Sequence, residues 1–408
     1  MLNWVKQFNI FCLLDSQEYN DEKSAFECLL AVGCKRSLTA ASGNALSQLQ
    51  AFYKENPSWL FGHLGYDLKN ETAHLSSSNP DKIEFPDLFF FEPEILIQLT
   101  ANTVIFHGVD APEQLYHTIL SMPDTIEPNA PYALNIQSRF SKDAYIKTIH
   151  QLQAHILRGD CYEINFCQEF FAANAKVNPI VLYHRLTTIS PNPFAALYRL
   201  NDCYCVCASP ERYIQIKGNQ IISQPIKGTA KRNLKNIEID ELHKSTLLHS
   251  EKERSENVMV VDLVRNDLSR CCEEGSVHVE ELFGIYSFPQ VHQMISTVKG
   301  TLAANKNWVD AIQVSFPMGS MTGAPKKRVL ELIEQYEQTK RGIFSGSIGY
   351  CTPYGDVDFN VIIRSILYNA TKQYLSFQTG SAITYYADAE MEYEECLMKA
   401  AAIRSVLT

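Results

Sequence analysis

The sequence contains no apolar run near the roughly 18 residues that a membrane-spanning helix needs. Its start, MLNWVKQFNIFCLLDSQ, has too short and too broken an apolar stretch for a secretory signal. Basic residues are in deficit, because 36 Lys and Arg stand against 46 Asp and Glu, giving a net charge of −10 at pH 7. We therefore expect a cytoplasmic protein that binds neither a membrane nor a nucleic acid.

Metal-like cysteine spacing is absent too, since none of the twelve cysteines belongs to a Cys-x-x-Cys pair. Cys203, Cys205 and Cys207 alternate in LNDCYCVCASP, which is the pattern of one face of a β-strand. Buried cysteine commonly serves as a small hydrophobic residue. We expect these three side chains to pack in a core as free thiols, as suits a reducing compartment.

The segment MGSMTGAPKKRVLELI (318–333) has a turn of small residues before a helix, but it lacks the G-x-x-x-x-G-K-[ST] pattern of a phosphate-binding loop. We therefore exclude nucleotide binding of that kind. The start of this helix, reached by Ser320 and Thr322, could still orient an anion.

Two polar stretches, SSSNPD (76–81) and MPDTIEPNAPYA (122–133), predict loops. We expect the second loop to separate an N-terminal lobe (residues 1–133) from a larger core (residues 134–408).

Within the core, Ser141 is the expected N-cap of a helical pattern that Gly159 ends. Strand patterns follow to about residue 226, and residues 243–270 are helical in pattern. Further strands and a closing helix complete the chain. Because strands precede and follow the helices rather than alternate with them, the predicted fold class is α+β with a large antiparallel sheet.

Two pairs of glutamates have the same spacing on two predicted helices: Glu253 with Glu256 in EKERSENV, and Glu392 with Glu395 in MEYEECLM. Residues three apart share a helix face. A single such pair is typical of a solvated helix surface. If the two helices converge, however, the four carboxylates would form an oxygen-only site of the kind that suits Mg²⁺.

Three further features each have a structural and a functional interpretation. Arg364 in NVIIRS ends an apolar strand, so it needs either a structural ion pair or a substrate carboxylate. QTGSAI (378–383) is either a plain turn or a set of backbone N–H groups that face an anion. His292 in FPQVHQM is either a core residue or an acid–base group.

Several motifs occur in a fixed order: ASPER, PIKGTAKR, SENVMVVDLVRNDL, GSMTGAPK, SGSIGY, VIIRS and EYEECLMKA. Together they resemble the chorismate-utilising enzymes, which include anthranilate synthase component I, aminodeoxychorismate synthase component I, and the isochorismate and salicylate synthases. The resemblance runs from about residue 139 to the C-terminus. It is weaker in the N-terminal lobe, at LLDS (13–16) and FGHLGYDL (61–68). It implies antiparallel sheets packed as a sandwich with helices outside.

Lys227 in PIKGT decides between the subgroups. Anthranilate and isochorismate synthases typically have alanine at this position, whereas aminodeoxychorismate synthases have lysine. GSMTGAPK also resembles the aminodeoxychorismate synthases. The resemblance therefore implies conversion of chorismate to 4-amino-4-deoxychorismate, on the route to para-aminobenzoate and folate.

The implied chemistry is covalent catalysis, in which Lys227 attacks C2 of chorismate as the C4 hydroxyl leaves, and ammonia then attacks C4 and expels the lysine. A neutral amine is required, so we expect burial beside Ile226 and nearby cations to lower the pKa of Lys227. By the same resemblance, Glu211 of ASPER is the candidate acid for the hydroxyl.

The resemblance also implies the remaining site residues. Mg²⁺ would be held by Glu256 and Glu395, with Glu253 and Glu392 close behind, directly or through water. The enolpyruvyl carboxylate would be held by Tyr350, Arg364 and the backbone of Gly380, Ser381 and Ala382. Four more residues would line the pocket: Thr229, His292, Ser320 and Lys399.

A separate glutamine amidotransferase subunit is the expected ammonia source, because no G-x-C-x-G glutaminase segment occurs and AVGCKRS (31–37) fails to match it. Glu163 stands where related synthases often have glutamine, or lysine in isochorismate synthases, which argues against hydration to isochorismate. Two alternatives stay open: an anthranilate synthase component I that releases pyruvate, and an inactive subunit that binds chorismate or a partner.

Overall fold

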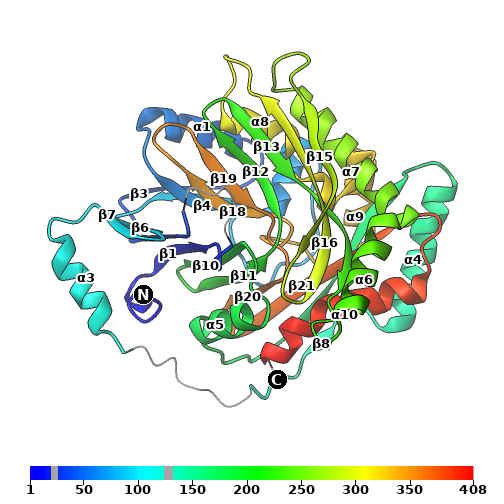
Figure 1. Ribbon diagram of the computed structural model, residues 1–408, viewed down its shortest axis with the longest axis horizontal. Helices are drawn as coiled ribbons and strands as arrows, with labels where there is room; N and C mark the ends of the chain where they lie inside the picture. The colour runs from blue at the N-terminus through cyan, green and yellow to red at the C-terminus, as the bar shows by residue number, and fades with distance from the viewer. Residues whose placement is uncertain (20–25, 124–131, 408) are drawn as a thin grey trace.

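The computed structural model describes residues 1–19, 26–123 and 132–407 of the chain. Within these ranges the strands form two large sheets in which neighbouring strands are antiparallel, and helices lie around them (Figure 1). The predicted α+β fold class is confirmed. Of the two predicted loops, residues 76–81 are irregular, whereas residues 124–131 of the second lie outside the described residues.

The first sheet has strands from the C-terminal part of the chain at one edge and strands from the N-terminal part at the other. Its strands in spatial order are β17 (Gly323–Ala324), β9 (Glu163–Ala172), β21 (Tyr374–Ile383), β20 (Ser365–Asn369), β11 (Cys203–Ser209), β10 (Phe194–Leu200), β1 (Ile10–Asp15), β2 (Cys28–Val32), β6 (Ile95–Thr100) and β7 (Thr103–His107), and β8 (Gln137–Ser138) also pairs with β9.

The second sheet is built in the same manner. Its strands in spatial order are β14 (Ile226–Lys231), β16 (Val291–Thr301), β13 (Gln220–Gln224), β12 (Arg212–Lys217), β19 (Val357–Asn360), β18 (Ser347–Cys351), β4 (Leu60–Leu64), β5 (Leu88–Glu92) and β3 (Arg36–Ala40), and β15 (His278–Ser287) also pairs with β16.

Strands from residues 1–133 therefore lie at one end of each sheet, and strands from residues 134–408 form the rest. In the first sheet β1 pairs with β10, and in the second β4 pairs with β18. The two sequence segments thus share both sheets, while the division into a lobe and a core stays a prediction.

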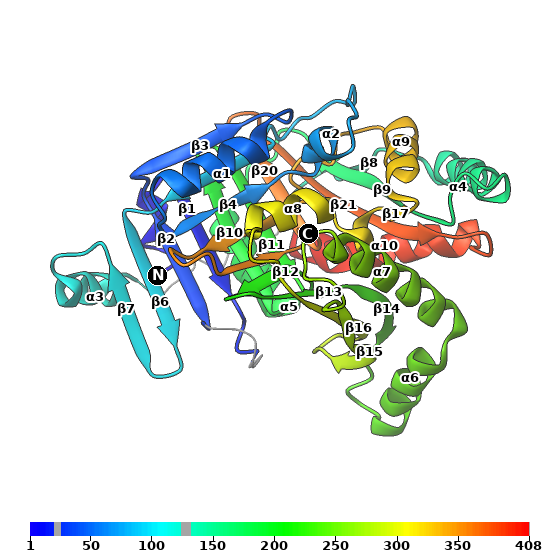
Figure 2. The ribbon, with the colours of Figure 1, turned by 90° about the horizontal axis from the view of Figure 1, so that it is seen from above.

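The helices cover the outer surfaces of the sheets. They are α1 (Ala45–Glu55), α2 (Lys69–Thr72), α3 (Pro112–Ser121), α4 (Lys142–Leu157), α5 (Pro179–Ile189), α6 (Ile237–His249), α7 (Glu251–Ser269), α8 (Trp308–Ser315), α9 (Lys326–Tyr336) and α10 (Ala389–Leu407). Helix α10 packs on β21, and α7 packs on β14, β15 and β16. Both views place α3 at the end of the molecule opposite α4, α7 and α10 (Figures 1 and 2).

The cores follow from the alternation of side chains along the strands. In β11, Cys205 and Cys207 join an apolar cluster that includes residues of both sheets. Val206 and Ala208, between and after them, join a second cluster that includes α4, α5, α9 and α10. The partly buried Cys203 packs against the first cluster as well. The prediction that these three cysteines pack in a core is confirmed, and all three are free thiols.

Capping side chains determine where helices α4 and α7 begin. Ser141 accepts a hydrogen bond from the Ala144 backbone at the start of α4, as predicted. The helical pattern predicted over 243–270 is divided at Ser250, whose backbone is extended and whose side chain accepts a hydrogen bond from the Glu253 backbone. This serine therefore starts α7 three residues before Glu253.

None of the helices in the described ranges combines the length and the apolar character that crossing a membrane would demand.

A buried arginine connects three segments near the end of α9. Arg341 donates to the backbone oxygens of Met321 at 2.7 Å and Asn165 at 2.8 Å, and it pairs with Glu337 at 2.7 Å. Its side chain is 1% exposed. We expect Arg341→Met to lower the free energy of unfolding by roughly 3–5 kcal/mol, because Glu337 would be left buried without its cation.

Equilibrium urea unfolding would measure this loss. The control is Arg158→Met, whose guanidinium pairs with Asp160 but is 64% exposed, so its loss should leave the unfolding midpoint almost unchanged. Equal unfolding midpoints for the two variants would contradict the prediction.

Candidate functional site

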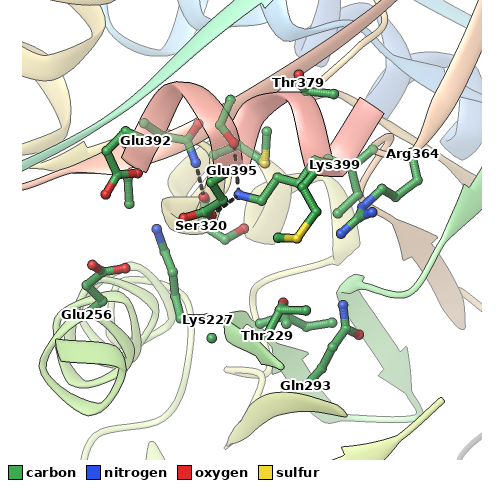
Figure 3. Close-up of a pocket in the computed structure, with 18 of the residues that line it drawn as sticks. Lys227, Thr229, Glu256, Gln293, Ser320, Arg364, Thr379, Glu392, Glu395 and Lys399 are labelled. Atoms are coloured by element: carbon green, nitrogen blue, oxygen red, sulfur yellow. Dashed lines mark hydrogen bonds and ion pairs between the residues drawn. The ribbon is translucent and has the colours of Figure 1, made fainter. Parts of the chain in front are cut away.

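A cavity of about 730 Å³ lies between the two sheets, at the end of each sheet that is formed by strands from residues 134–408. Strands β9 and β21 contribute to it from the first sheet, β14 and β16 from the second, and helices α7 and α10 line it as well (Figure 3).

The structure brings most of the predicted site residues into this one cavity. Those that line it are Glu211, Lys227, Thr229, Glu253, Glu256, Ser320, Arg364, Gly380, Ala382, Glu392, Glu395 and Lys399. They come from segments almost 190 residues apart in sequence (211 to 399). The site residues that the ordered motifs predict, although far apart in sequence, therefore lie around one cavity in the folded chain.

His292 is not part of the lining, so its predicted place in the pocket is wrong. It is buried on the other face of β16, where Nδ1 lies 2.8 Å from the Ser287 hydroxyl and Nε2 3.2 Å from Asp240. Successive side chains of a strand point to opposite faces. Its neighbour Gln293 therefore lines the cavity instead.

Tyr350 also lies elsewhere, and its prediction is likewise wrong. Its ring packs against Phe26, Trp59 and Phe61, beside a separate cavity of about 60 Å³. The aromatic residue that lines the main cavity is Phe344, from the same GIFSGSIGY segment. Both aromatic residues occur in this short segment, but only the course of the chain into β18 determines which of them faces the main cavity.

Ser381 points away from the cavity, between two residues of β21 that line it, Gly380 and Ala382. Its hydroxyl lies 3.5 Å from that of Tyr145. The pairing of β21 with β20 extends only from residue 374 to 376. The edge of β21 next to the cavity is thus free of β20 at Gly380.

Two carboxylate pairs line the cavity from different helices, Glu253 and Glu256 from α7 and Glu392 and Glu395 from α10. Burial raises the pKa of Glu256 to about 8 and also raises that of Glu253. Burial acts in the same direction on Glu395, but Lys399, 2.7 Å away, holds the pKa of this carboxyl below its usual value.

A lysine bridges the two helices at this end of the cavity. Lys252 Nζ lies 3.1 Å from Glu392 Oε1 and 4.0 Å from Glu256 Oε1. In this arrangement no three His, Cys, Asp or Glu side chains of the described chain come together as a metal site. Two buried oxygens, Glu256 Oε1 and Glu392 Oε2, nevertheless accept no hydrogen bond. Carboxylate oxygens of this kind could hold a hard divalent cation.

Lys227 points into the cavity from β14 (Figure 3). Its Nζ donates to Glu163 Oε1 at 2.6 Å, an ion pair between β14 of the second sheet and β9 of the first. Gly228, at a φ of +93°, lets β14 approach α7, because a Cβ there would lie 3.0 Å from Glu253 Oε2.

The expected lowering of the Lys227 pKa is wrong. Burial alone would lower it, but the nearby carboxylates, Glu163 and Glu256 foremost, raise it above its usual value. The expectation failed because the groups around this amine are anions rather than cations. Lys227 is therefore an ammonium ion in this structure.

Glu211 lies between β11 and β12, with its backbone N–H held by the Ser209 hydroxyl at 3.2 Å. Burial raises the pKa of its carboxyl to about 7, although the Ser320 hydroxyl and Lys227 favour the anion. A carboxyl that is half protonated near neutral pH can donate a proton to a leaving group.

The opposite end of the cavity is cationic (Figure 3). Arg364 does not end a strand, as the sequence suggested, but precedes β20 at a φ of +53°. Burial lowers the pKa of its guanidinium, for which the described residues provide no hydrogen bond or ion pair. Such a cation is suited to a bidentate carboxylate of a ligand.

The cavity therefore has an acidic end, a cationic end, and a lysine and a carboxylic acid between them. This arrangement suits a small anion. At the acidic end a divalent cation held by the glutamates could bind it, and at the opposite end Arg364 could bind it.

Comparison with known proteins agrees with this chemistry. The family model described as "chorismate binding enzyme" matches residues 11–405. This chain belongs to the chorismate-binding enzyme family. It is a chorismate-utilising enzyme, and the match extends the sequence resemblance through most of the N-terminal segment.

Similar proteins carry names from two branches of the family. The chain is 36% identical to an anthranilate synthase component I-like protein of Synechocystis, over 86% of this chain and 72% of that protein. It is 33% identical to aminodeoxychorismate synthase component 1 of Klebsiella aerogenes, over 83% of this chain and 74% of that protein. The solved anthranilate synthase component I of Streptococcus pneumoniae superimposes with a TM-score of 0.80 at 25% identity, covering 96% of this chain and 94% of that one.

For this chorismate-binding enzyme we expect Arg364→Ala to weaken chorismate binding by roughly 10- to 100-fold, since hydrogen bonds to charged groups contribute about 1.5–3 kcal/mol. Isothermal titration calorimetry with chorismate would measure the change.

Tyr350→Phe is the matched control, because the structure places its hydroxyl outside the cavity. Its chorismate affinity should stay within about twofold of wild type. A larger loss for Tyr350→Phe than for Arg364→Ala would reverse the assignment.

Proposed function

We propose that this chain is aminodeoxychorismate synthase component I, which converts chorismate and ammonia to 4-amino-4-deoxychorismate. The observation that carries the proposal is the amine of Lys227, which points into the cavity beside Glu211 and opposite the helices of the two glutamate pairs. A primary amine at the centre of a chorismate site is suited to attack the ring.

The names of relatives support the proposal at modest identity, because aminodeoxychorismate synthase component 1 of Klebsiella aerogenes is matched over most of both chains. The place of the reaction in para-aminobenzoate and folate synthesis, and in the cytoplasm, belongs to the same proposal.

In this mechanism Arg364 binds one carboxylate of chorismate and sets the orientation of the ring. Lys227, once neutral, forms a bond to C2, the ring double bonds shift, and the bond from C4 to its hydroxyl breaks. Glu211 gives its proton to that hydroxyl, which leaves as water. Ammonia then attacks C4, and the bond between C2 and Lys227 breaks. Two substitutions of this kind retain the configuration at C4.

Mg²⁺ is the proposed cofactor, with Glu253, Glu256, Glu392 and Glu395 as its holders. The buried oxygens of Glu256 and Glu392 that accept no hydrogen bond support this fit. When bound, the ion would neutralise the negative charge of the second substrate carboxylate. Lys252 would have to leave its position between Glu256 and Glu392 for the ion to enter.

A separate glutamine amidotransferase subunit is the proposed ammonia source. Free ammonium at high concentration should replace it in a purified system, which makes the synthase testable alone.

Anthranilate synthase component I is the second candidate, and the close superposition with the Streptococcus pneumoniae enzyme favours it. In that reaction pyruvate leaves the ring and Lys227 has no covalent role.

The product decides between these functions. Incubation of the purified chain with chorismate, Mg²⁺ and ammonium should yield 4-amino-4-deoxychorismate without pyruvate, as measured by liquid chromatography and mass spectrometry. Lys227→Ala should lower amination by at least about 100-fold, because the nucleophile is lost.

Chelation of Mg²⁺ before the assay should also abolish the product. Anthranilate with pyruvate would replace the proposal by the second candidate. A folded sample that makes neither product with metal, ammonium and partner would favour an inactive subunit.

The pH dependence tests Glu211. A general acid must be protonated, so kcat/KM for chorismate, at constant free ammonia, should fall by up to about tenfold per unit as the pH rises above about 7. Glu211→Gln should remove this limb of the profile and lower the rate by about 10²–10⁴-fold. A wild-type profile in the variant would assign the acid to another group.

A further inference from the structure

We propose that Glu163 is the group that removes the proton from the Lys227 ammonium and holds the resulting amine toward the cavity. This inference rests on the proposed function, in which Lys227 is the nucleophile, and it names the group that prepares that nucleophile.

The contact itself is the first argument. Glu163 Oε1 is the acceptor for Lys227 Nζ at 2.6 Å, and in the described chain the ammonium has no other hydrogen-bond partner. A proton can therefore pass directly between these two atoms. The pair also joins the two sheets, so the packing of β9 and β14 fixes its geometry.

The position of Glu163 excludes a direct contact with substrate. Its side chain is 1% exposed and does not line the cavity, so Lys227 stands between Glu163 and any ligand. Glu163 Oε2 is buried and accepts no hydrogen bond. A buried carboxylate that serves only structure is normally satisfied at both oxygens.

The other acidic groups around Lys227 are at longer range. Burial lowers the pKa of Lys227, but the carboxylates together raise it further, so the resting form is the ammonium. The acidic groups that interact with it are Glu163 on β9, Glu211 before β12, Glu253 and Glu256 on α7, and Glu395 on α10. Two cations of the same helices, Lys252 on α7 and Lys399 on α10, line the cavity with it. In the proposed function Glu211 is the acid and the other three hold the cation, which leaves Glu163 as the base.

The proton and the electrons balance over the cycle. The proton moves from Nζ to Glu163 Oε1, and the ion pair becomes a neutral pair. The freed lone pair forms the C2–N bond and the ring double bonds shift, so that their electrons expel the C4 hydroxyl, which leaves as water with the Glu211 proton. When ammonia bonds to C4, the C2–N electrons return to Nζ, and Glu163 gives its proton back to Lys227. The ammonium formed at C4 returns one proton to Glu211, which restores both carboxyl groups. Substrate that excludes water from the cavity favours the neutral pair, because charges lose their solvation.

Glu163→Gln tests the assignment, and Glu169→Gln is its control. Glu169 lies six residues further along the same face of β9 and is buried, but it pairs with Arg139 and Tyr374 away from the cavity. Both variants thus lose one buried, paired carboxylate of the same strand. Circular dichroism and urea unfolding would confirm that each is folded.

The first readout does not need turnover. The pH dependence of Lys227 acetylation by acetic anhydride, followed by peptide mass spectrometry, reports when its amine becomes neutral. We expect the midpoint to fall by at least about one pH unit in Glu163→Gln and to stay unchanged in Glu169→Gln. An unchanged midpoint in Glu163→Gln would overturn the inference.

The second readout is the amination rate. Near neutral pH, Glu163→Gln should lower kcat by about 10²–10⁴-fold with the chorismate KM within about threefold of wild type. Its rate should rise with pH where the wild-type rate does not, because solvent must then take the proton. Glu163→Asp, which keeps the carboxylate, should recover part of the rate, and it serves as the second variant if glutamine prevents folding.

These outcomes distinguish a failure of the proposed function from a failure of the role proposed for Glu163. Anthranilate from the wild-type chain would overturn the proposed function and the nucleophile with it. Wild-type kcat in Glu163→Gln, in samples that make 4-amino-4-deoxychorismate, would overturn the role of Glu163 alone. A loss that is equal at every pH and is accompanied by a raised KM would assign Glu163 a structural role instead.

Discussion

The face-to-face packing of the two sheets is the constraint on which the rest of the structure depends. Inward-facing side chains of both sheets share one apolar cluster, which keeps the sheets in a fixed relation. Strands from the N-terminal segment complete one end of each sheet. At the other end β9 and β21 face β14 and β16 across a cavity rather than across apolar side chains. The functional groups are therefore positioned by the same packing that stabilises the fold.

The cavity concentrates charges of both signs that would be costly to bury alone. Lys227, Lys252 and Lys399 are each paired with a glutamate, at distances between 2.6 and 3.1 Å. Arg364 is the exception, since the described residues give its guanidinium no hydrogen bond or ion pair. The solvation that this guanidinium loses on burial is then compensated only when an anion binds to it. The same logic makes the Lys227–Glu163 pair reactive, because a substrate that displaces water changes which form of the pair is favoured.

Much of this site could be predicted from the order of short motifs. The glutamate pairs, Glu211, Lys227 and Arg364 were all identified, and all line the cavity. His292 and Tyr350 were misplaced, because a strand presents alternate residues to opposite faces and one position decides between His292 and Gln293. Phe344 was not assigned to the site, because only the course of the chain into β18 brings this side chain to the cavity. A motif identifies the segment, but it does not say which side chains of the segment face the ligand.

The sequence by itself determined the α+β class, the cysteines of the core, the capped start of α4, and the family to which the chain belongs. These follow from local periodicity, from capping and from residue types at set spacings. Only the tertiary structure decided the charge state of Lys227. Burial beside Ile226 and nearby cations was expected to lower its pKa, yet the neighbours of the amine in space are carboxylates on β9, α7 and α10. Electrostatic energy depends on distance in space, and those distances are set by long-range packing.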